Sequence, residues 1–407
     1  FTKGTLTQRH EPEGIVVDIP FLQTPQDEPD VLEVLEGGSG NRLVRIRDGD
    51  GTAIKKTAFG DPTTGEDQEA LAKLDFEEQT MRRARDDGLP FFPASRGFQF
   101  DEERRHATVL MEDFPDRYPV AQLLEWNAAD TPAGVNPRTP LISAEQVWQV
   151  LLHVYGTLSQ RLYHQSTGEG SYETYTRDLL ERSRVRRGDA AHQAPLLREM
   201  LDADVLRIDQ PDGQRVYLPG QWKFQELIWR LGSCGLFSPS GGFRRVRVHG
   251  DLNPGNILID LLDFVGPHGA PKDFKLIDPR AFPGGGYDPM YDFVKLVYMF
   301  SGSYLRGRHP EVYGFEPIPS RGVGGLAAFR AYDRREEVRD PRTASLFSMT
   351  DELNTRLEHW LRTTDNFFGL ENDPFWKIRF VFLHAMTNAG LLMYGNGVDQ
   401  IGVVPTT

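Results

Sequence analysis

Cysteine is almost absent from this chain, which has a single one, Cys234, among 407 residues. One thiol excludes a framework of internal disulfides and is typical of a protein in a reducing compartment. No run of about eighteen apolar residues occurs, so we expect no transmembrane helix and no membrane partner. The first residues are polar and charged and show no signal-peptide pattern, which favours a cytoplasmic location.

An excess of basic charge is absent as well. The chain has 46 Lys and Arg residues against 59 Asp and Glu residues, a formal net charge of −13. This balance disfavours nucleic acid as a partner. Hydrophobic residues make up 39% of the chain, and its length is ample for two lobes with buried cores.

The most informative segment is residues 248–259, with the sequence VHGDLNPGNILI. It places a carboxylate, Asp251, and a carboxamide, Asn256, five positions apart on a loop that leads into an apolar run. A second carboxylate, Asp278, follows another apolar run at residues 274–277. Phosphoryl transfer from a nucleotide needs a base near the acceptor hydroxyl and oxygen ligands for Mg²⁺. These three side chains have the chemistry for both roles.

The apolar runs predict how these side chains meet. Residues 256–264 and 274–277 have the composition of strands, and the sequence GPHGAP between them is typical of a turn. We therefore expect an antiparallel hairpin, in which Asn256 and Asp278 meet at one end. Mg²⁺ keeps several waters and takes one or two protein ligands, so this pair suffices to hold it.

A glycine-rich turn near the start of the chain predicts a phosphate-binding loop. It lies between two predicted strands at residues 31–35 and 42–47. Glycines let backbone N–H groups approach phosphate oxygens without interference from Cβ atoms. An ordinary tight turn is the more frequent explanation of such a pattern. The candidate residues are Gly37, Gly38, Ser39, Gly40 and Asn41.

Together these motifs resemble a known family. HGDLNPGN followed by LIDPR is similar to the catalytic and metal-binding segments of aminoglycoside phosphotransferases and of related choline- and sugar-kinase-like enzymes. GGSGN before an alternating strand is similar to their phosphate loop. These enzymes have the protein-kinase fold and phosphorylate hydroxyls of small molecules. The resemblance implies that Asp251 is the catalytic base, that Asn256 and Asp278 bind Mg²⁺, and that His249 and Asp292 support the catalytic loop.

The resemblance also implies an α+β, bilobal fold. We expect a small β-rich lobe at residues 1–113, of which 1–30 form an irregular extension. A larger helical lobe should follow at residues 114–407, with an inserted helical subdomain within 165–248. Helical periodicity at residues 144–164 and 343–393 agrees with this expectation.

A strand at residues 52–57 carries two adjacent lysines, Lys55 and Lys56. Alternation along a strand lets only one of them face the nucleotide, and the family pattern favours Lys55. Its partner in the family is a Glu on the next helix, expected at residues 66–87. Glu77 fits this place because it shares a helical face with Met81 and Ala84, and Glu78 is the alternative.

The strand that begins at residue 107 runs into a connector that resembles the hinge between kinase lobes. By this resemblance, backbone groups near Glu112 and Phe114 would bind the purine, and Met111 would border the adenine pocket. A methionine in an apolar strand is more often part of the core.

The expected function is ATP-dependent transfer of the γ-phosphate to a hydroxyl of a small molecule. A sugar, an amino sugar or a glycosylated metabolite is the preferred acceptor, and an antibiotic-type acceptor stays open. The expected cofactors are Mg²⁺ and ATP, with GTP not excluded. The alternatives are a protein kinase and a nucleotide-binding pseudokinase or nucleotidyltransferase of the same fold. Neither the acceptor nor the oligomeric state follows from the sequence.

Overall fold

The computed structural model describes residues 30–35, 42–59, 67–101, 106–125, 142–164, 166–171, 203–220, 226, 230, 242–260, 273–280, 282, 286–301, 312–318, 325–365, 367 and 376–391. The chain divides into two compact units, one made of residues 1–71 and 95–113, the other of 72–94 and 114–407. One boundary between these units falls between residues 113 and 114. Residues 72–94, which we expected in the amino-terminal lobe, belong to the second unit.

The first unit contains a five-stranded sheet in which every neighbouring pair is antiparallel. The spatial order is β1 (Val31–Leu35), β2 (Arg42–Asp48), β3 (Gly51–Phe59), β5 (His106–Glu112) and β4 (Ser95–Asp101). Burial alternates along β5, as expected of a strand with one covered face. Where the sheet ends, Asp113 accepts hydrogen bonds from Arg45 Nε at 2.7 Å and Thr52 Oγ1 at 2.6 Å.

Helix α1 (Asp67–Asp86) lies between β3 and β4 in the sequence and coincides closely with its predicted bounds. Its buried face includes Leu74, Met81 and Ala84. The helix ends at Gly88, which has a φ of +66°, and the N–H of Leu89 then donates to the carbonyl of Ala84 at 2.8 Å. Glycine suits this position because a Cβ is disfavoured at positive φ.

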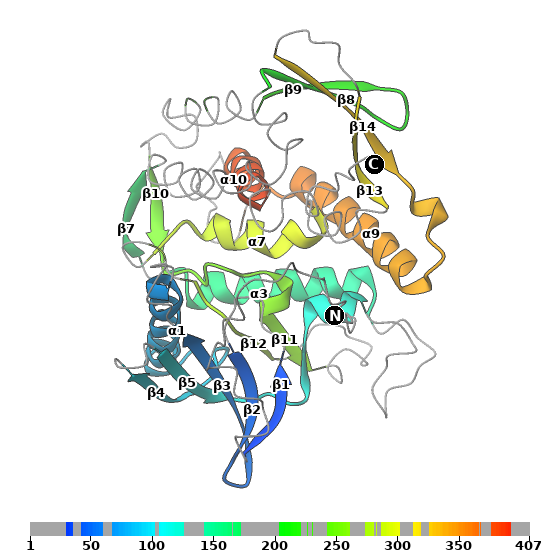
Figure 1. Ribbon diagram of the computed structural model, residues 1–407. Helices are drawn as coiled ribbons and strands as arrows, with labels where there is room; N and C mark the ends of the chain where they lie inside the picture. The colour runs from blue at the N-terminus through cyan, green and yellow to red at the C-terminus, as the bar shows by residue number, and fades with distance from the viewer. Residues whose placement is uncertain are drawn as a thin grey trace, which may run out of the picture. The chain divides into compact units, whose positions relative to one another are not determined.

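Four long helices form the centre of the part of the second unit that the structure describes. They are α3 (Ala144–Arg161), α7 (Pro289–Ser301), α9 (Pro341–Thr363) and α10 (Trp376–Leu391), with the short α2 (Val120–Glu125) beside them. Helix α7 lies between α3 and α10 (Figure 1), and its residues 289–300 are all buried. The prediction of helices at 144–164 and 343–393 is confirmed, although the latter forms two helices.

Aromatic rings join these helices into one core. Phe293 of α7 lies 5.1 Å from Trp360 of α9 and 5.0 Å from Phe367, measured between ring centroids. Trp376 of α10 stacks on Phe367 at 5.1 Å. An ion pair is buried beside them, because Arg379 Nε donates to Asp288 Oδ2 at 3.1 Å. This packing fixes α7 against its neighbours.

The segment expected to hold a helical insertion contains strands in its described part. β7 (Ser166–Ser171) pairs with β10 (Gly242–Val246). β8 (Val205–Asp209) and β9 (Arg215–Pro219) join β13 (Tyr313–Pro317) and β14 (Leu326–Asp333) in a four-stranded sheet, seen in Figure 1. The sequence did not predict these strands; β8 pairs with β14, which comes from a distant part of the chain. Residues 172–202 of the expected insertion lie outside the described residues.

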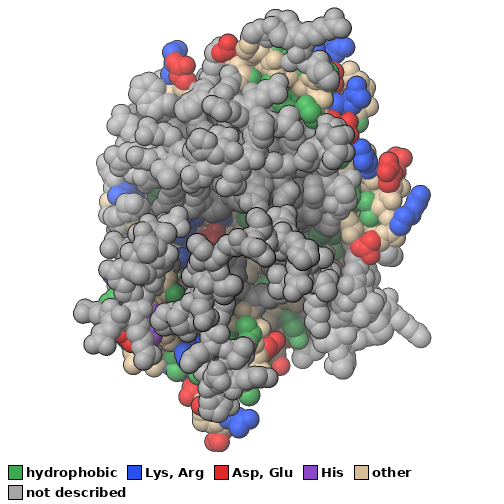
Figure 2. Space-filling view, in the orientation of Figure 1, with side chains coloured by type: hydrophobic (Ala, Val, Ile, Leu, Met, Phe, Trp, Pro, Cys, Tyr) green, Lys and Arg blue, Asp and Glu red, His purple; other side chains and the backbone are tan. Residues whose placement is uncertain are grey.

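On the face seen in Figure 2, acidic and basic side chains of the described residues lie interspersed. The described part of that face therefore presents no broad basic patch. Among the described helices, none has the length and apolar character that a membrane span requires.

Candidate functional site

The predicted hairpin is present and brings the two expected metal ligands together. β11 (Ile257–Asp260) pairs antiparallel with β12 (Phe274–Leu276), with Ile257 opposite Leu276. β6 (Arg117–Pro119) pairs with the other edge of β11. At the open end of the hairpin, the N–H of Ile277 donates to the carbonyl of Asn256 at 3.0 Å. Asn256 therefore lies opposite Ile277, the residue directly before Asp278.

The loop that precedes β11 is held by its own side chains. Asn256 Nδ2 donates to the carbonyl of Asp251 at 2.8 Å, which ties the two ends of the loop together. Asn253 caps a single 3₁₀ turn (Pro254–Asn256) by accepting the N–H of Gly255 at 2.9 Å. Asn256 uses its amide nitrogen in this way, so its amide oxygen is the atom available to a cation.

The backbone explains why residue 250 is a glycine. Its φ is +82°, a region that side chains with a Cβ rarely adopt. A Cβ would lie 2.4 Å from the carbonyl oxygen of Arg280 and 2.8 Å from Cε2 of Phe282. The N–H of Arg280 also donates to the carbonyl of His249 at 2.8 Å. The loop and the segment after β12 are thus packed backbone to backbone.

His249 is fully buried and braces the loop from inside. Its Nδ1 accepts the N–H of Asp251 at 3.3 Å, so Nε2 carries the proton and donates to the carbonyl of Ile277 at 3.0 Å. Burial lowers the pKa of His249 to about 4, although Asp251 and Asp278 oppose the shift. The imidazole is therefore neutral near pH 7, and its two hydrogen bonds connect the loop at Asp251 to the backbone at Ile277.

Asp292, in the first turn of α7, reaches the backbone of the same loop. Its carboxylate accepts the N–H of His249 at 2.7 Å, the N–H of Gly250 at 2.8 Å and the hydroxyl of Tyr163 at 2.9 Å. Burial raises the pKa of Asp292 to about 7, even though these three hydrogen bonds lower it. The helix thereby fixes the two residues that precede Asp251.

Asp251 forms an ion pair that the sequence analysis missed. Lys295, three residues after Asp292 on α7, places Nζ 2.7 Å from Asp251 Oδ1. Burial alone would raise the pKa of Asp251, but Lys295 and Arg280 outweigh burial and lower it. The one available signal was a lysine inside the apolar run at residues 293–297, where a buried charge requires a partner.

Asp278 has the only positive φ, 57°, among the non-glycine residues that the structure describes. Such a conformation is uncommon outside glycine and clusters at functional sites. Lys73 of α1 contacts both carboxylate oxygens, with Nζ 3.1 Å from Oδ1 and 3.2 Å from Oδ2. A cation is thus already favoured at this carboxylate.

The donor set fits Mg²⁺. One carboxylate and one amide oxygen, at the same end of the hairpin, are hard oxygen ligands of the kind this ion takes. The described residues contain no cluster of three or more His, Cys, Asp or Glu side chains suited to a metal. The ion would therefore have two protein ligands and complete its shell with water and phosphate.

The predicted nucleotide contacts of the first unit are only partly visible. Residues 37–41 lie outside the described residues. Lys55 pairs with Leu110, whereas Lys56 pairs with Val109 and Ile54 with Met111. Paired residues point to the same face of an antiparallel sheet. Lys55 and Met111 therefore lie on opposite faces, and the expectation that both line one nucleotide pocket is wrong.

The remaining predicted contacts divide between the units. Glu112 ends β5 in the first unit, whereas Phe114 belongs to the second, where its ring faces Lys275 Nζ at 5.2 Å. Glu77 and Glu78 are both buried, and Glu78 forms an ion pair with Arg82. Glu77 belongs to the second unit and Lys55 to the first, so their pairing stays a prediction.

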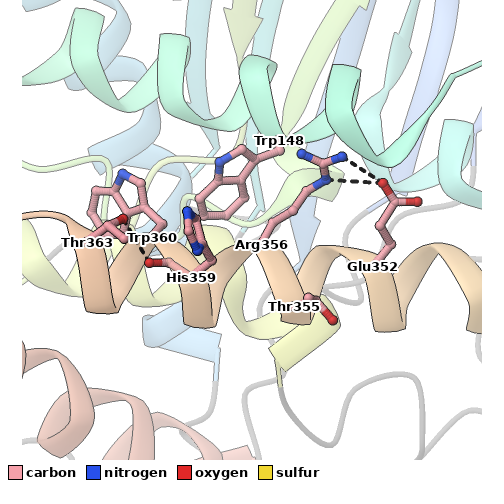
Figure 3. A pocket seen from close by; sticks show the side chains of 7 residues that line it. All are labelled: Trp148, Glu352, Thr355, Arg356, His359, Trp360 and Thr363. Atoms are coloured by element: carbon pink, nitrogen blue, oxygen red, sulfur yellow. Dashed lines mark hydrogen bonds and ion pairs between the residues drawn. The ribbon is translucent and has the colours of Figure 1, made fainter.

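A cavity of about 420 Å³ lies elsewhere on the second unit (Figure 3). It is lined by Trp148 of α3 and by Glu352, Thr355, Arg356, His359, Trp360 and Thr363 of α9. Arg356 turns towards Glu352 and donates to it at 2.8 Å. No residue of the 249–256 loop lines this cavity, so it is separate from the candidate active site.

The sequence profile of the phosphotransferase enzyme family matches residues 31–268, more than half of the chain. The chain belongs to this family. Membership agrees with the α+β fold, which has a small β-rich unit and a larger, mainly helical one. In this phosphotransferase, Asp278 and α7 follow the matched segment, whereas Asp251 and Asn256 lie within it.

Several solved structures are similar to this phosphotransferase. The GDP complex of aminoglycoside 2'-phosphotransferase-IIIa is 14% identical, with 89% of this chain and 94% of that chain covered and a TM-score of 0.39. A thermostable mutant of aminoglycoside phosphotransferase APH(4)-Ia is 13% identical, covering 88% and 94%, with a TM-score of 0.37. A glucosamine kinase is 12% identical, covering 90% and 92%, with a TM-score of 0.29. Identities and scores this low say nothing about the acceptor. No curated protein matches the chain in sequence.

Proposed function

We propose that this phosphotransferase moves the γ-phosphate of ATP to a hydroxyl of a small molecule, with a sugar or amino sugar as the preferred acceptor. The observation that carries the proposal is the loop at residues 249–256. It holds one partly accessible carboxylate, that of Asp251, beside a pair of oxygen ligands suited to Mg²⁺. The sequence motif and the geometry of the loop both support the proposal for these three residues.

In this proposal Asp251 orients the acceptor hydroxyl and accepts its proton late in transfer. Asn256 and Asp278 hold Mg²⁺, which supplies charge neutralisation on the phosphates. His249 and Asp292 keep the loop in place through the hydrogen bonds described above. Little covalent chemistry is left to the protein, so the loop acts chiefly by positioning its side chains.

The first unit would hold the nucleotide. Residues 37–41 and Lys55 are proposed to contact the phosphates, with Lys56 as the alternative lysine. Glu77 is proposed as the partner of that lysine. The backbone near Glu112 would bind the purine edge. The family membership supports these assignments, and each of them can be tested by mutation.

Mass spectrometry of acceptors incubated with ATP and Mg²⁺ tests the reaction type. A gain of one phosphate, accompanied by ADP, is the expected result. A gain of a nucleotide, accompanied by pyrophosphate, would assign the chain to nucleotidyl transfer instead. Sugars, amino sugars, aminoglycosides and a generic protein substrate form the panel, so a protein kinase would also be recognised.

The variant Asp251→Asn tests the assignment of the base. It keeps the shape of the side chain and removes the charge, so ADP binding measured by calorimetry should stay within about twofold. Turnover should fall by about 100-fold or more, the usual contribution of a general base. Undiminished turnover would reject Asp251 as the base.

A further inference from the structure

Lys295 is a buried lysine whose ammonium group contacts the proposed base. Its side chain is 9% exposed, and Nζ lies 2.7 Å from Asp251 Oδ1. The ring of Tyr298 lies beneath the same ammonium, with its centroid 4.8 Å away. A charged group at such depth is stable only with close partners, and these two neighbours provide them.

Helix α7 controls the loop from two positions one turn apart. Asp292 holds the backbone N–H groups of His249 and Gly250, while Lys295 holds the side chain of Asp251. Residues three apart on a helix lie on the same face, so both contacts come from one rigid surface. Every residue of α7 from 289 to 300 is buried, and this surface has little freedom to shift.

The ion pair places the two carboxylate oxygens of Asp251 in different surroundings. Oδ1 is buried and faces Lys295, whereas the side chain as a whole is 23% exposed. Of the two carboxylate oxygens, Oδ2 is therefore the one that an acceptor can reach. One oxygen is anchored inside the protein, and the other is presented to whatever approaches the loop.

We propose that Lys295 is a positioning residue for phosphoryl transfer, which anchors Asp251 Oδ1 so that Oδ2 is directed at the acceptor hydroxyl. This inference rests on the proposed function and extends it to a residue outside the sequence motifs. Lys295 acts through Asp251 and takes no proton from the acceptor. Without this anchor, the carboxylate of Asp251 would be free to rotate and to turn towards Mg²⁺ bound at Asp278.

The variants Lys295→Met and Lys295→Arg test the proposal, with hydrolysis of ATP–Mg²⁺ to ADP as the reaction because it needs no identified acceptor. Lys295→Met should lower kcat by about 10- to 100-fold, with KM for ATP within about twofold. Lys295→Arg keeps the charge and should recover most of the lost rate. Lys377→Met, a partly buried lysine of α10 that lies over Trp376, is the matched control and should keep the wild-type rate.

A double variant separates positioning from a structural role. If Lys295 acts only through Asp251, adding Lys295→Met to Asp251→Asn should cause no further loss of kcat. The double variant also removes both charges of the pair, so it is expected to fold even if Lys295→Met alone does not. A further loss of tenfold or more in the double variant would overturn the proposal, as would a wild-type kcat in Lys295→Met. A wild-type protein that releases no ADP with water or with any acceptor would instead overturn the proposed function.

Discussion

Replacing Gly250 by alanine should destabilise the protein by more than the conformation of its backbone alone accounts for. The added Cβ would lie 2.4 Å from the carbonyl oxygen of Arg280, closer than any real contact. That carbonyl cannot simply move, because the N–H of the same residue donates to His249 at 2.8 Å. The clash involves backbone on both sides, so a change of side-chain rotamer does not relieve it.

The magnitude follows from two contributions. A side chain at positive φ costs about 1–2 kcal/mol. Displacing Arg280 weakens its hydrogen bond to His249, which contributes about 0.5–1.5 kcal/mol. We therefore expect Gly250→Ala to lower the free energy of unfolding by about 1.5–3.5 kcal/mol. Since the glycine adjoins Asp251, turnover should fall as well.

Gly88→Ala is the matched control. Gly88 belongs to the same unit and has a φ of +66°, but a Cβ there meets nothing within 4 Å. The Gly88→Ala variant should lose only the backbone contribution, about 1–2 kcal/mol. Urea unfolding followed by tryptophan fluorescence measures both variants. Equal losses for Gly250→Ala and Gly88→Ala would refute the argument that the Arg280 carbonyl makes Gly250 necessary.

Three further changes have defined outcomes. Lys73→Met removes the ammonium group that contacts Asp278, so the Mg²⁺ concentration that gives half-maximal ADP release should fall. An unchanged Mg²⁺ concentration would contradict a metal site at Asp278. Burial in the folded chain lowers the pKa of His249 to about 4, against 6.5 in the unfolded chain. The contribution of neutral His249 to the free energy of unfolding is therefore fully present above pH 6.5 and is lost as the pH falls to 4. This loss is about 3 kcal/mol, and it should be missing from the pH dependence of unfolding in His249→Gln. Arg379→Met leaves Asp288 buried without its cation and should lower the free energy of unfolding in urea by about 3–5 kcal/mol. Adding Asp288→Asn should restore part of this loss. An unchanged free energy of unfolding in Arg379→Met would show that the ion pair is dispensable.

Local patterns in the sequence were enough to predict many elements. The strand at residues 31–35 and the helices α1 and α3 form where alternation and helical periodicity place them. The hairpin of β11 and β12 follows from two apolar runs and the turn between them. In each case, the residues that determine the element lie within or next to it.

Features that depend on distant partners were not predictable. β8 pairs with β14, more than a hundred residues later, and nothing near β8 in the sequence indicates this. The register between β3 and β5 places Lys55 and Met111 on opposite faces, which neither strand reveals alone.

The candidate site shows the same division. Asp251, Asn256 and Asp278 belong to compact motifs and were found from the sequence. Lys295 lies outside them and acquires its meaning only when α7 packs beneath the loop. Contacts made by a packed helix therefore define the part of the site that motifs omit.

The most direct measurement is ADP release from ATP and Mg²⁺ across a panel of sugars, amino sugars and aminoglycosides, with wild type and Asp251→Asn in parallel. At least one acceptor should raise the wild-type rate above that with water alone, and Asp251→Asn should lose this increase while still binding ADP. If no acceptor raises the wild-type rate, or if Asp251→Asn matches wild type, the 249–256 loop is not the phosphoryl-transfer site.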